Sequence, residues 1–239
     1  MRQIVVTGGG TGIGYAIAEH FATAGDAVTI TGRRVEVLQR AADTLGARAL
    51  PFDATDPEAV EAAAQQLPDR VDVLVNNAGG NTDLQLPEPD GLAGLAASWE
   101  ANLRANLLSA VLVTAAVTPR LPDNARVITI GSIAGSQGSG GSYGAAKAGV
   151  AAWSAGIAAE LGPRGITANV IAPGLIGETE FFHGKLSDER RAQLVAATRN
   201  KRQGAPADLA ALVGFLASAE SGHLTGQVLH LNGGAHLGN

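Results

Sequence analysis

Short runs of apolar and β-branched residues alternate along the chain with longer, alanine-rich segments. The runs are apolar at consecutive positions rather than at every second one, so they predict strands that are buried on both faces of a parallel sheet. The predicted strands are residues 3–7, 27–31, 48–52, 71–75, 126–130, 167–172 and 227–231.

The segments between these runs have the length and composition of helices, and proline marks the start of two of them. Pro57 directly follows Asp56, and Pro206 opens another apolar segment, as expected at a first helical position. Alternating strands and helices predict an α/β fold, a Rossmann-type doubly wound parallel sheet with helices on both faces. No low-complexity linker or internal repeat occurs, so we expect a single domain over residues 1–239. The predicted helices are residues 13–24, 35–45, 57–67, 97–118, 143–161 and 206–218.

Composition excludes several classes of protein. The chain has 239 residues, of which 46% are hydrophobic, and its net charge of −5 argues against a non-specific nucleic-acid binder. The absence of cysteine excludes disulfides and cysteine-ligated metals, and the five histidines have no metal-ligand spacing, so we expect no metal. We find neither a secretory signal nor an apolar stretch of about 18 residues, so we expect a cytoplasmic protein with no membrane partner.

A glycine-rich turn, "TGGGTGIG", follows the first predicted strand and precedes the first helix. Gly8, Gly12 and Gly14 permit a tight turn and a close approach of backbone to a phosphate, while the helix N-terminus offers free N–H groups. This placement favours a dinucleotide site. The alternative is a tight turn without a ligand.

Two arginines follow the second predicted strand, in "ITGRRVE". Arg33 lies nineteen residues after Gly14, at the corner where an acidic residue would bind the ribose 2′-hydroxyl of NAD and an arginine accommodates the 2′-phosphate of NADP. A guanidinium binds phosphate through parallel N–H bonds, so this position favours NADP(H) over NAD(H). We expect Arg34 either to stack on adenine or to face solvent. The glycine turn itself carries Thr11 where many NADP users carry a second basic residue.

Several motifs occur in one order along the chain and together resemble the short-chain dehydrogenase/reductase family. They are the glycine turn, "NNAG" at residues 76–79, a serine after the fifth strand, "YGAAK" at 143–147 and "APG" at 172–174. The resemblance covers residues 3–234, and the pattern is most like that of 3-oxoacyl-acyl-carrier-protein reductases.

The resemblance implies a catalytic set of Asn106, Ser132, Tyr143 and Lys147. Tyr143 and Lys147 are one helical turn apart, and an ammonium beside a phenol lowers a pKa that is ordinarily about 10. Asn106 would bind a water of the proton relay, and we expect the neighbouring Asn102 on a solvated helix face. A Tyr-x-x-x-Lys pair by itself is also common on helix surfaces.

The resemblance also implies a cofactor-binding set at the carboxyl ends of the strands. Asp53 would contact adenine, although a turn or helix cap is the alternative, and the usual threonine after the sixth strand comes one residue late, as Thr179. We expect residues 176–204 to form a substrate lid, in which Phe181 and Phe182 contact substrate or anchor the lid. The set is Gly8, Thr11, Gly12, Ile13, Gly14, Arg33, Arg34, Asp53, Ala54, Asn77, Ala78, Gly79, Tyr143, Lys147, Pro173, Gly174, Ile176 and Thr179.

The expected activity is NADP(H)-dependent reduction of a keto group to a secondary alcohol, with a small-molecule or carrier-protein-bound substrate. Arg126 and Arg164 would meet a carrier protein or be plain surface charge. The alternatives are an NAD-dependent alcohol dehydrogenase of the same family and a non-catalytic dinucleotide-binding regulatory protein. The resemblance further implies a homo-oligomer, either a tetramer or a dimer.

Overall fold

A parallel sheet forms the centre of the molecule in the computed structural model, which describes residues 1–85 and 89–238. Within these residues seven strands lie in the order β3-β2-β1-β4-β5-β6-β7. The order reverses between β1 and β4, which creates the crevice where doubly wound sheets bind ligands. The predicted fold class is therefore confirmed. The strands are β1 (Gln3–Thr7), β2 (Ala27–Gly32), β3 (Arg48–Pro51), β4 (Val73–Asn76), β5 (Arg126–Ile130), β6 (Thr167–Pro173) and β7 (Val228–Leu231).

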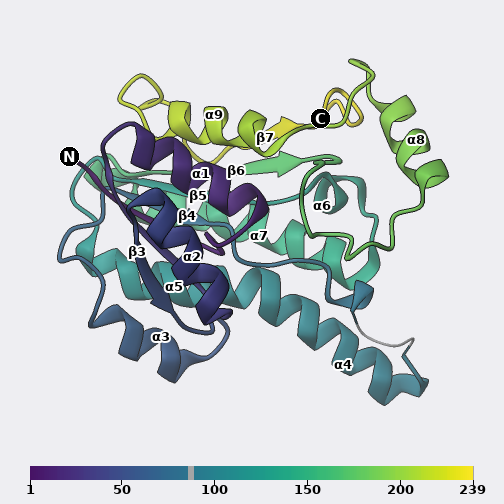
Figure 1. Ribbon diagram of the computed structural model, residues 1–239, viewed down its shortest axis with the longest axis horizontal. Coiled ribbons are helices and arrows are strands. Elements are labelled where there is room, and N and C mark those ends of the chain that lie inside the picture. Colours follow the sequence, from purple (N-terminus) through teal and green to yellow (C-terminus); the bar gives the residue numbers. More distant parts are fainter. Residues whose placement is uncertain (86–88, 239) are drawn as a thin grey trace.

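Helices cover both faces of this sheet (Figure 1). On one face lie α1 (Gly12–Thr23), α2 (Val35–Leu45) and α9 (Pro206–Leu216), and on the other α3 (Pro57–Ala64), α5 (Ser109–Val117) and α7 (Gly141–Leu161). The remaining helices are α4 (Gly91–Leu103), α6 (Ile133–Gln137) and α8 (Asp188–Ala197), and the short turns are η1 (Thr82–Leu84), η2 (Arg104–Leu108), η3 (Thr118–Arg120) and η4 (Gly162–Arg164).

Strand β1 shows why the strands are apolar at every position. Ile4 and Val6 pack into the cluster under α1, α2 and α9, whereas Val5 between them packs into the cluster under α3, α5 and α7. All three side chains are fully buried. Because successive strand residues point to opposite faces, a sheet covered on both sides requires apolar side chains throughout.

The helix predicted over residues 97–118 is longer and interrupted. It begins at Gly91, and the π-helical turn η2 separates α4 from α5. The continuous run Gly91–Arg120 is long and apolar enough by length and composition to cross a membrane, although it contains Glu100 and Arg104, and 39% of its apolar window is buried inside the structure. Part of the exposed remainder is an apolar stripe on α4, formed by Leu92, Leu95, Trp99 and Leu103.

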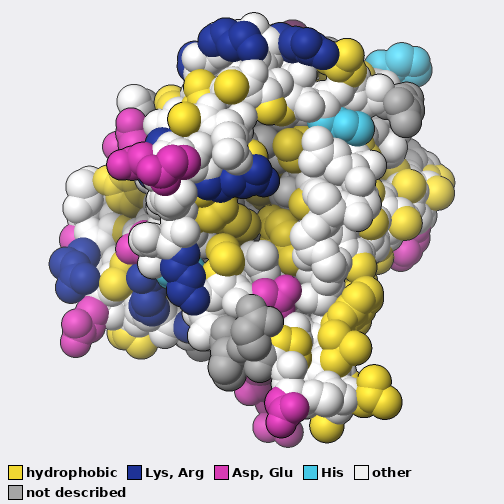
Figure 2. Space-filling view, turned by 90° about the vertical axis from the view of Figure 1, so that its right-hand side faces the viewer, with side chains coloured by type: hydrophobic (Ala, Val, Ile, Leu, Met, Phe, Trp, Pro, Cys, Tyr) yellow, Lys and Arg dark blue, Asp and Glu magenta, His cyan; other side chains and the backbone are white. Residues whose placement is uncertain are grey.

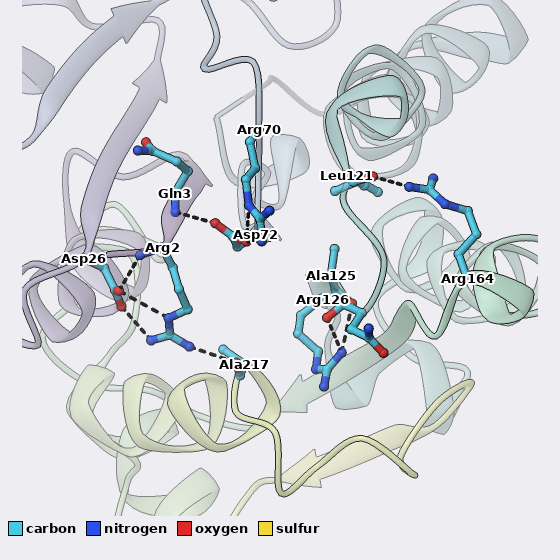
Figure 3. A network of polar contacts seen from close by, with 11 residues as sticks. Arg2, Gln3, Asp26, Arg70, Asp72, Leu121, Ala125, Arg126, Arg164 and Ala217 are labelled. Carbon is cyan, nitrogen blue, oxygen red and sulfur yellow. Dashed lines mark hydrogen bonds and ion pairs between the residues drawn. The ribbon is translucent and has the colours of Figure 1, made fainter.

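A polar network joins the amino ends of the strands (Figure 3). The guanidinium of Arg2 donates to Asp26 at 2.6 Å and to the carbonyl of Ala217 at 2.9 Å, which ties β1 to the loop before β2 and to the end of α9. The Gln3 amide donates to Asp72 at 2.8 Å, and Arg70 pairs with the same carboxylate.

The same edge corrects both interpretations of Arg126. This side chain is only 7% exposed, and its guanidinium donates to the carbonyls of Asn124, Ala125 and Ser218. It is therefore neither surface charge nor free to meet a carrier protein. Arg164 is half-exposed, but it pairs with Asp123 and donates to the Leu121 carbonyl.

Candidate active site

The expected site residues gather at the carboxyl ends of the strands. Figure 2 faces this side of the molecule and shows a hollow near its centre, with hydrophobic side chains inside and Lys and Arg side chains around it. A cavity of about 180 Å³ is lined by Ser132 and Lys147 together with residues of α6, α7, β6 and β7. The loops after β1, β2, β4, β5 and β6 meet around this region, as expected for a doubly wound sheet.

The glycine turn has the conformation that a phosphate cradle requires. Gly8 and Gly12 have φ angles of +66° and +55°, which L-residues rarely adopt. A Cβ on Gly14 would lie 2.1 Å from the carbonyl oxygen of Gly8, so this helix can pack against the turn only with glycine. Thr11 precedes α1 without capping it through its side chain, which leaves the N–H groups of the first turn available for an anion. This backbone fits a dinucleotide phosphate, and Ile13 lies within the first turn of α1.

The two arginines after β2 have different partners, and one of them contacts this turn. Arg33 is exposed and its guanidinium is 3.9 Å from Asp53. Arg34 donates to Glu180 at 2.9 Å and to the Thr11 hydroxyl at 3.2 Å. Arg34 therefore contacts the glycine turn and the 176–204 segment, which neither expectation for this residue included.

Asp53 acts as a turn cap in this structure. Its carboxylate accepts hydrogen bonds from the backbone and the hydroxyl of Thr55, both at 2.9 Å. The next residue, Ala54, is buried. The second oxygen of Asp53 faces Arg33, so both residues expected at the adenosine end of a dinucleotide lie together.

The loop after β4 is fastened to the glycine turn. The Thr7 hydroxyl accepts the backbone N–H groups of Asn77 and Ala78, both at 2.9 Å, while the Asn77 side chain donates to the carbonyls of Thr7 and Gly8. The sequence interpretation did not assign a role to Thr7. A polar residue at the end of an apolar strand, directly before the glycine turn, is the feature of the sequence that could have indicated this role.

Asn106 lies in the π-helical turn η2, against the end of β4. Its side chain accepts from the Gly80 amide at 3.0 Å and donates to the Gly80 carbonyl at 2.9 Å. A Cβ on Gly79 would lie 2.6 Å from the Asn106 carboxamide oxygen, so glycine is required for this contact. Single π-turns inside helices occur frequently at functional sites.

The expectation for Asn102 is wrong. This side chain is 0% exposed and hydrogen-bonds to Thr82, Asp83 and Ser142 instead of facing solvent. The sequence around Asn102 does not reveal that its side chain is buried, because its hydrogen-bond partners lie on η1 and α7.

The structure brings Ser132, Tyr143 and Lys147 together. Ser132 ends the loop after β5 and caps α6 through a bond from the Ala134 amide at 3.1 Å. Lys147 donates to the Ile130 carbonyl at 2.9 Å, and its ammonium lies 5.8 Å from the centre of the Tyr143 ring. The Tyr143 and Lys147 side chains are both buried, so they are not a Tyr–Lys pair on a helix surface.

Burial controls the protonation of this pair. It raises the pKa of Tyr143 to about 12, an effect that hydrogen bonding with Ser132 partly offsets. It lowers the pKa of Lys147 to about 8, because the charged ammonium is desolvated. The expected lowering of the phenol pKa is therefore wrong for the protein's own groups: desolvation dominates, and the Lys147 ammonium faces a backbone carbonyl.

The segment after β6 closes on itself beside the glycine turn. Pro173 ends β6, a Cβ on Gly174 would meet Asn232 at 2.9 Å, and Ile176 bridges to Gly204. The two ends of the 176–204 segment are thus paired. A Cβ on Gly12 would lie 3.5 Å from Thr179, so the late threonine still lies beside the glycine turn.

The aromatic pair of the 176–204 segment covers the tyrosine. The Phe181 ring meets the Tyr143 ring edge-on at 5.7 Å, and Phe182 meets Phe181 at 4.9 Å. Since Glu180 pairs with Arg34 and Phe181 contacts Tyr143, two consecutive residues link Arg34 to Tyr143.

Known proteins resemble this chain over almost its whole length. A family model described as enoyl-(acyl carrier protein) reductase matches residues 8–236. The 3-oxoacyl-[acyl-carrier-protein] reductases of Escherichia coli and Vibrio cholerae are 38% and 36% identical, with coverage of 98% and 99% of this chain and 96% and 98% of theirs.

Solved structures have the same fold. A metagenomic blue fluorescent protein in complex with NADPH has a TM-score of 0.86 at 32% identity, and a Burkholderia cenocepacia short chain dehydrogenase in complex with NADP has 0.85 at 30%. Both matches cover 98% of this chain and 97% of the other. Given the paired Tyr143 and Lys147, the glycine cradle and these relatives, the chain belongs to the short-chain dehydrogenase/reductase family of oxidoreductases.

Proposed function

We propose that this oxidoreductase uses NADPH to reduce a keto group to a secondary alcohol, with a 3-oxoacyl thioester as its substrate class. The observation that carries the proposal is the buried Tyr143, whose pKa responds to the nearby Ser132 and whose ring lies against Phe181. The 3-oxoacyl-[acyl-carrier-protein] reductases at 36–38% identity support the substrate class.

The chemistry divides between cofactor and protein. A bound nicotinamide supplies or accepts the hydride. Tyr143 gives its proton to the carbonyl oxygen, and the Ser132 hydroxyl donates a hydrogen bond that orients the same oxygen. A phenol whose pKa is raised to about 12 holds its proton at neutral pH, as reduction requires, and deprotonation for the reverse reaction depends on the added charge of an oxidised nicotinamide.

Lys147 and Asn106 support the proton transfer. With a pKa of about 8, Lys147 is mainly charged at neutral pH, and we assign it to the nicotinamide ribose and to the proton path toward Tyr143. Asn106 would place a water on this path, and its position in the π-helical turn η2 suits this role, since single π-turns occur frequently at functional sites.

The arrangement around the glycine turn supports NADP(H). Arg33 and Arg34 place two cations beside the turn, and NADP users among the solved relatives share the fold at 30–32% identity. Thr11 and Thr179 flank the helix N-terminus, where a pyrophosphate would lie.

A second candidate reaction follows from the family model that matches the chain. Its description names an enoyl reductase, which reduces a carbon–carbon double bond beside the thioester. A substrate panel with NADPH distinguishes the two reactions. We expect oxidation of NADPH with an acetoacetyl thioester and none with a crotonyl thioester, and the opposite pattern would contradict the proposed keto reduction.

Replacing Tyr143 tests the mechanism. Tyr143→Phe removes the proton donor but keeps the ring against Phe181, so we expect kcat to fall by about a thousandfold or more while NADPH still binds. The matched control is Tyr15→Phe, which changes the chain's other tyrosine, on α1. Turnover that survives in Tyr143→Phe would refute the assigned acid.

A further inference from the structure

A buried polar network connects the helix segment that carries Asn106 to the start of the helix that carries Tyr143. It consists of residues outside the proposed catalytic set. At its centre is Asn102, whose side-chain nitrogen donates to Asp83 and to the Ser142 hydroxyl, both at 2.9 Å. Its side-chain oxygen accepts the Thr82 amide at 3.1 Å. The exposed carboxylate of Asp83 also accepts from Ser98 at 2.7 Å and from Ser142 at 3.1 Å.

This network holds both helices that carry the active site. Ser142 directly precedes Tyr143 in the first turn of α7 and is only 3% exposed. The backbone carbonyl of Asn102 accepts a bond from the Asn106 side chain at 3.0 Å, one turn along the same helix run. Asn102 therefore touches the residue before the tyrosine and the side chain of the relay asparagine at once.

The chemistry of Asn102 suits no other residue type. One buried carboxamide donates two hydrogen bonds, to Asp83 and Ser142 on other elements, and accepts two, from the Thr82 amide and the Asn106 side chain. A leucine of similar size would fill the space but leave the Thr82 amide and the Ser142 hydroxyl with fewer partners. Fully satisfied buried networks fix a single arrangement of the elements they join.

We propose that Asn102, through Ser142 and Asp83, is a positioning residue that sets the start of α7, and hence the Tyr143 hydroxyl, relative to η2. This inference rests on the proposed keto reduction. It predicts an effect on the chemical step rather than on cofactor binding, because the hydrogen bonds of Asn102 reach Ser142, the residue before Tyr143, and the side chain of Asn106. Misplacing a reacting group by about 1 Å can cost on the order of a hundredfold in rate.

The experiment compares Asn102→Leu and Ser142→Ala with the wild type. In Asn102→Leu we expect kcat to fall by about tenfold or more while KM for NADPH changes by less than about threefold. We also expect the pH midpoint of the oxidative direction, which follows Tyr143 deprotonation, to move by at least about half a unit. Ser142→Ala keeps the Asn102–Asp83 bond and serves if the first variant does not fold, with the same direction of change.

The matched control is Asn169→Leu. Asn169 is equally buried, at 1% exposure, and likewise joins separate segments, donating to the Leu224 carbonyl at 2.7 Å and accepting from Gln227 at 3.1 Å. It lies in β6 at a distance in sequence from the catalytic set. We expect a comparable loss of melting temperature with kcat and the pH midpoint unchanged.

The outcomes separate the two claims. If Asn102→Leu and Ser142→Ala keep the wild-type kcat and pH midpoint, or if Asn169→Leu loses them equally, the positioning role is overturned. A wild type without turnover on any keto substrate contradicts the proposed function instead. In that case hydrogen exchange decides the positioning role: lost protection over residues 141–147 in Asn102→Leu, but not in Asn169→Leu, supports it, and unchanged protection overturns it.

Discussion

We propose that the arginines after β2 determine which dinucleotide the site accepts. Arg33 is exposed and can turn from Asp53 toward a phosphate at little cost, because exposed ion pairs contribute only about 0–1 kcal/mol. Arg34 is already held by Glu180 and Thr11. The structure thus supports the assignment of the 2′-phosphate to Arg33, while Arg34 links the 176–204 segment to the turn.

Reversing the charge at Arg33 tests this assignment. Arg33→Asp places a carboxylate where the 2′-phosphate of NADPH would lie, so we expect kcat/KM with NADPH to fall by about tenfold or more and the preference to turn toward NADH. Steady-state kinetics with both cofactors measure the ratio.

The control is Arg40→Asp, on the exposed face of α2, which should leave the ratio unchanged. An unaltered NADPH/NADH ratio in Arg33→Asp would move the assignment to Arg34.

The roles of residues that belong to a motif were predictable from the sequence. The roles of polar residues that are buried by distant parts of the chain were not. The family resemblance implied the grouping of Ser132, Tyr143 and Lys147, and the structure brings these residues together. The burial of Asn102 and Arg126 was not predicted because it depends on partners distant along the chain, Thr82 for Asn102 and Ser218 for Arg126. A polar residue between apolar neighbours looks the same in sequence whether it faces solvent or a buried carbonyl.

At the level of elements, glycines decide how closely helices and turns can approach. Gly14→Ala would place a methyl group 2.1 Å from the Gly8 carbonyl oxygen and 2.5 Å from the Asn77 side chain. Neither partner can retreat without opening the cradle. We therefore expect destabilisation of about 1–3 kcal/mol and at least about tenfold weaker NADPH binding, measured by thermal unfolding and cofactor fluorescence.

Gly156→Ala is the matched control. Gly156 is an exposed interior residue of α7, and an added Cβ would meet nothing within 4 Å. We expect stabilisation of about 0.5–1 kcal/mol with NADPH binding unchanged, since alanine restricts the unfolded chain more than glycine does. If both substitutions behave alike, the close approach at Gly14 is not what constrains the turn.

The strands and most helices were predictable because their apolar periodicity is set by burial on the sheet. β5 (Arg126–Ile130) and α2 (Val35–Leu45) match their predicted ranges. The sequence did not reveal α6, which is short, or α8, whose polar composition leaves no buried residue. It also did not reveal η2, because a π-turn has the composition of the helix around it.

Across the whole molecule, the amino ends and the carboxyl ends of the strands have different roles. The amino edge carries the network of Arg2, Asp26 and Asp72, and the carboxyl edge carries the site. Despite desolvation by burial, which acts in the opposite direction, bonds from Arg2 hold the pKa of Asp26 below its ordinary value, and bonds from Arg70 and Gln3 do the same for Asp72. A carboxylate with a lowered folded-state pKa stabilises the fold above its unfolded pKa, and this contribution is lost as the pH falls through the folded value.

Asp26→Asn tests this contribution. We expect the variant to be about 1 kcal/mol less stable than the wild type at neutral pH, because the Asp26 carboxylate joins β1 to the loop before β2. The difference should begin to shrink as the pH falls below about 3.8, the ordinary pKa of the carboxyl, and should disappear once the pH has fallen through the lower pKa of the folded state. Urea unfolding at several pH values measures it.

Asp123→Asn, which removes an exposed partner of Arg164, should change stability by less than about 0.5 kcal/mol at any pH. An Asp26→Asn deficit that persists undiminished into acid would contradict the ionic origin.

The parallel sheet also shapes how this chain can change over generations. Every strand begins at the edge held by Arg2, Asp26 and Asp72 and ends at the edge that holds Tyr143, so the two groups are separated by the length of the strands. Substitutions at well-separated sites have nearly additive effects. Lineages can therefore adjust heat or acid tolerance at one edge while specificity drifts at the other, with little interference between the two.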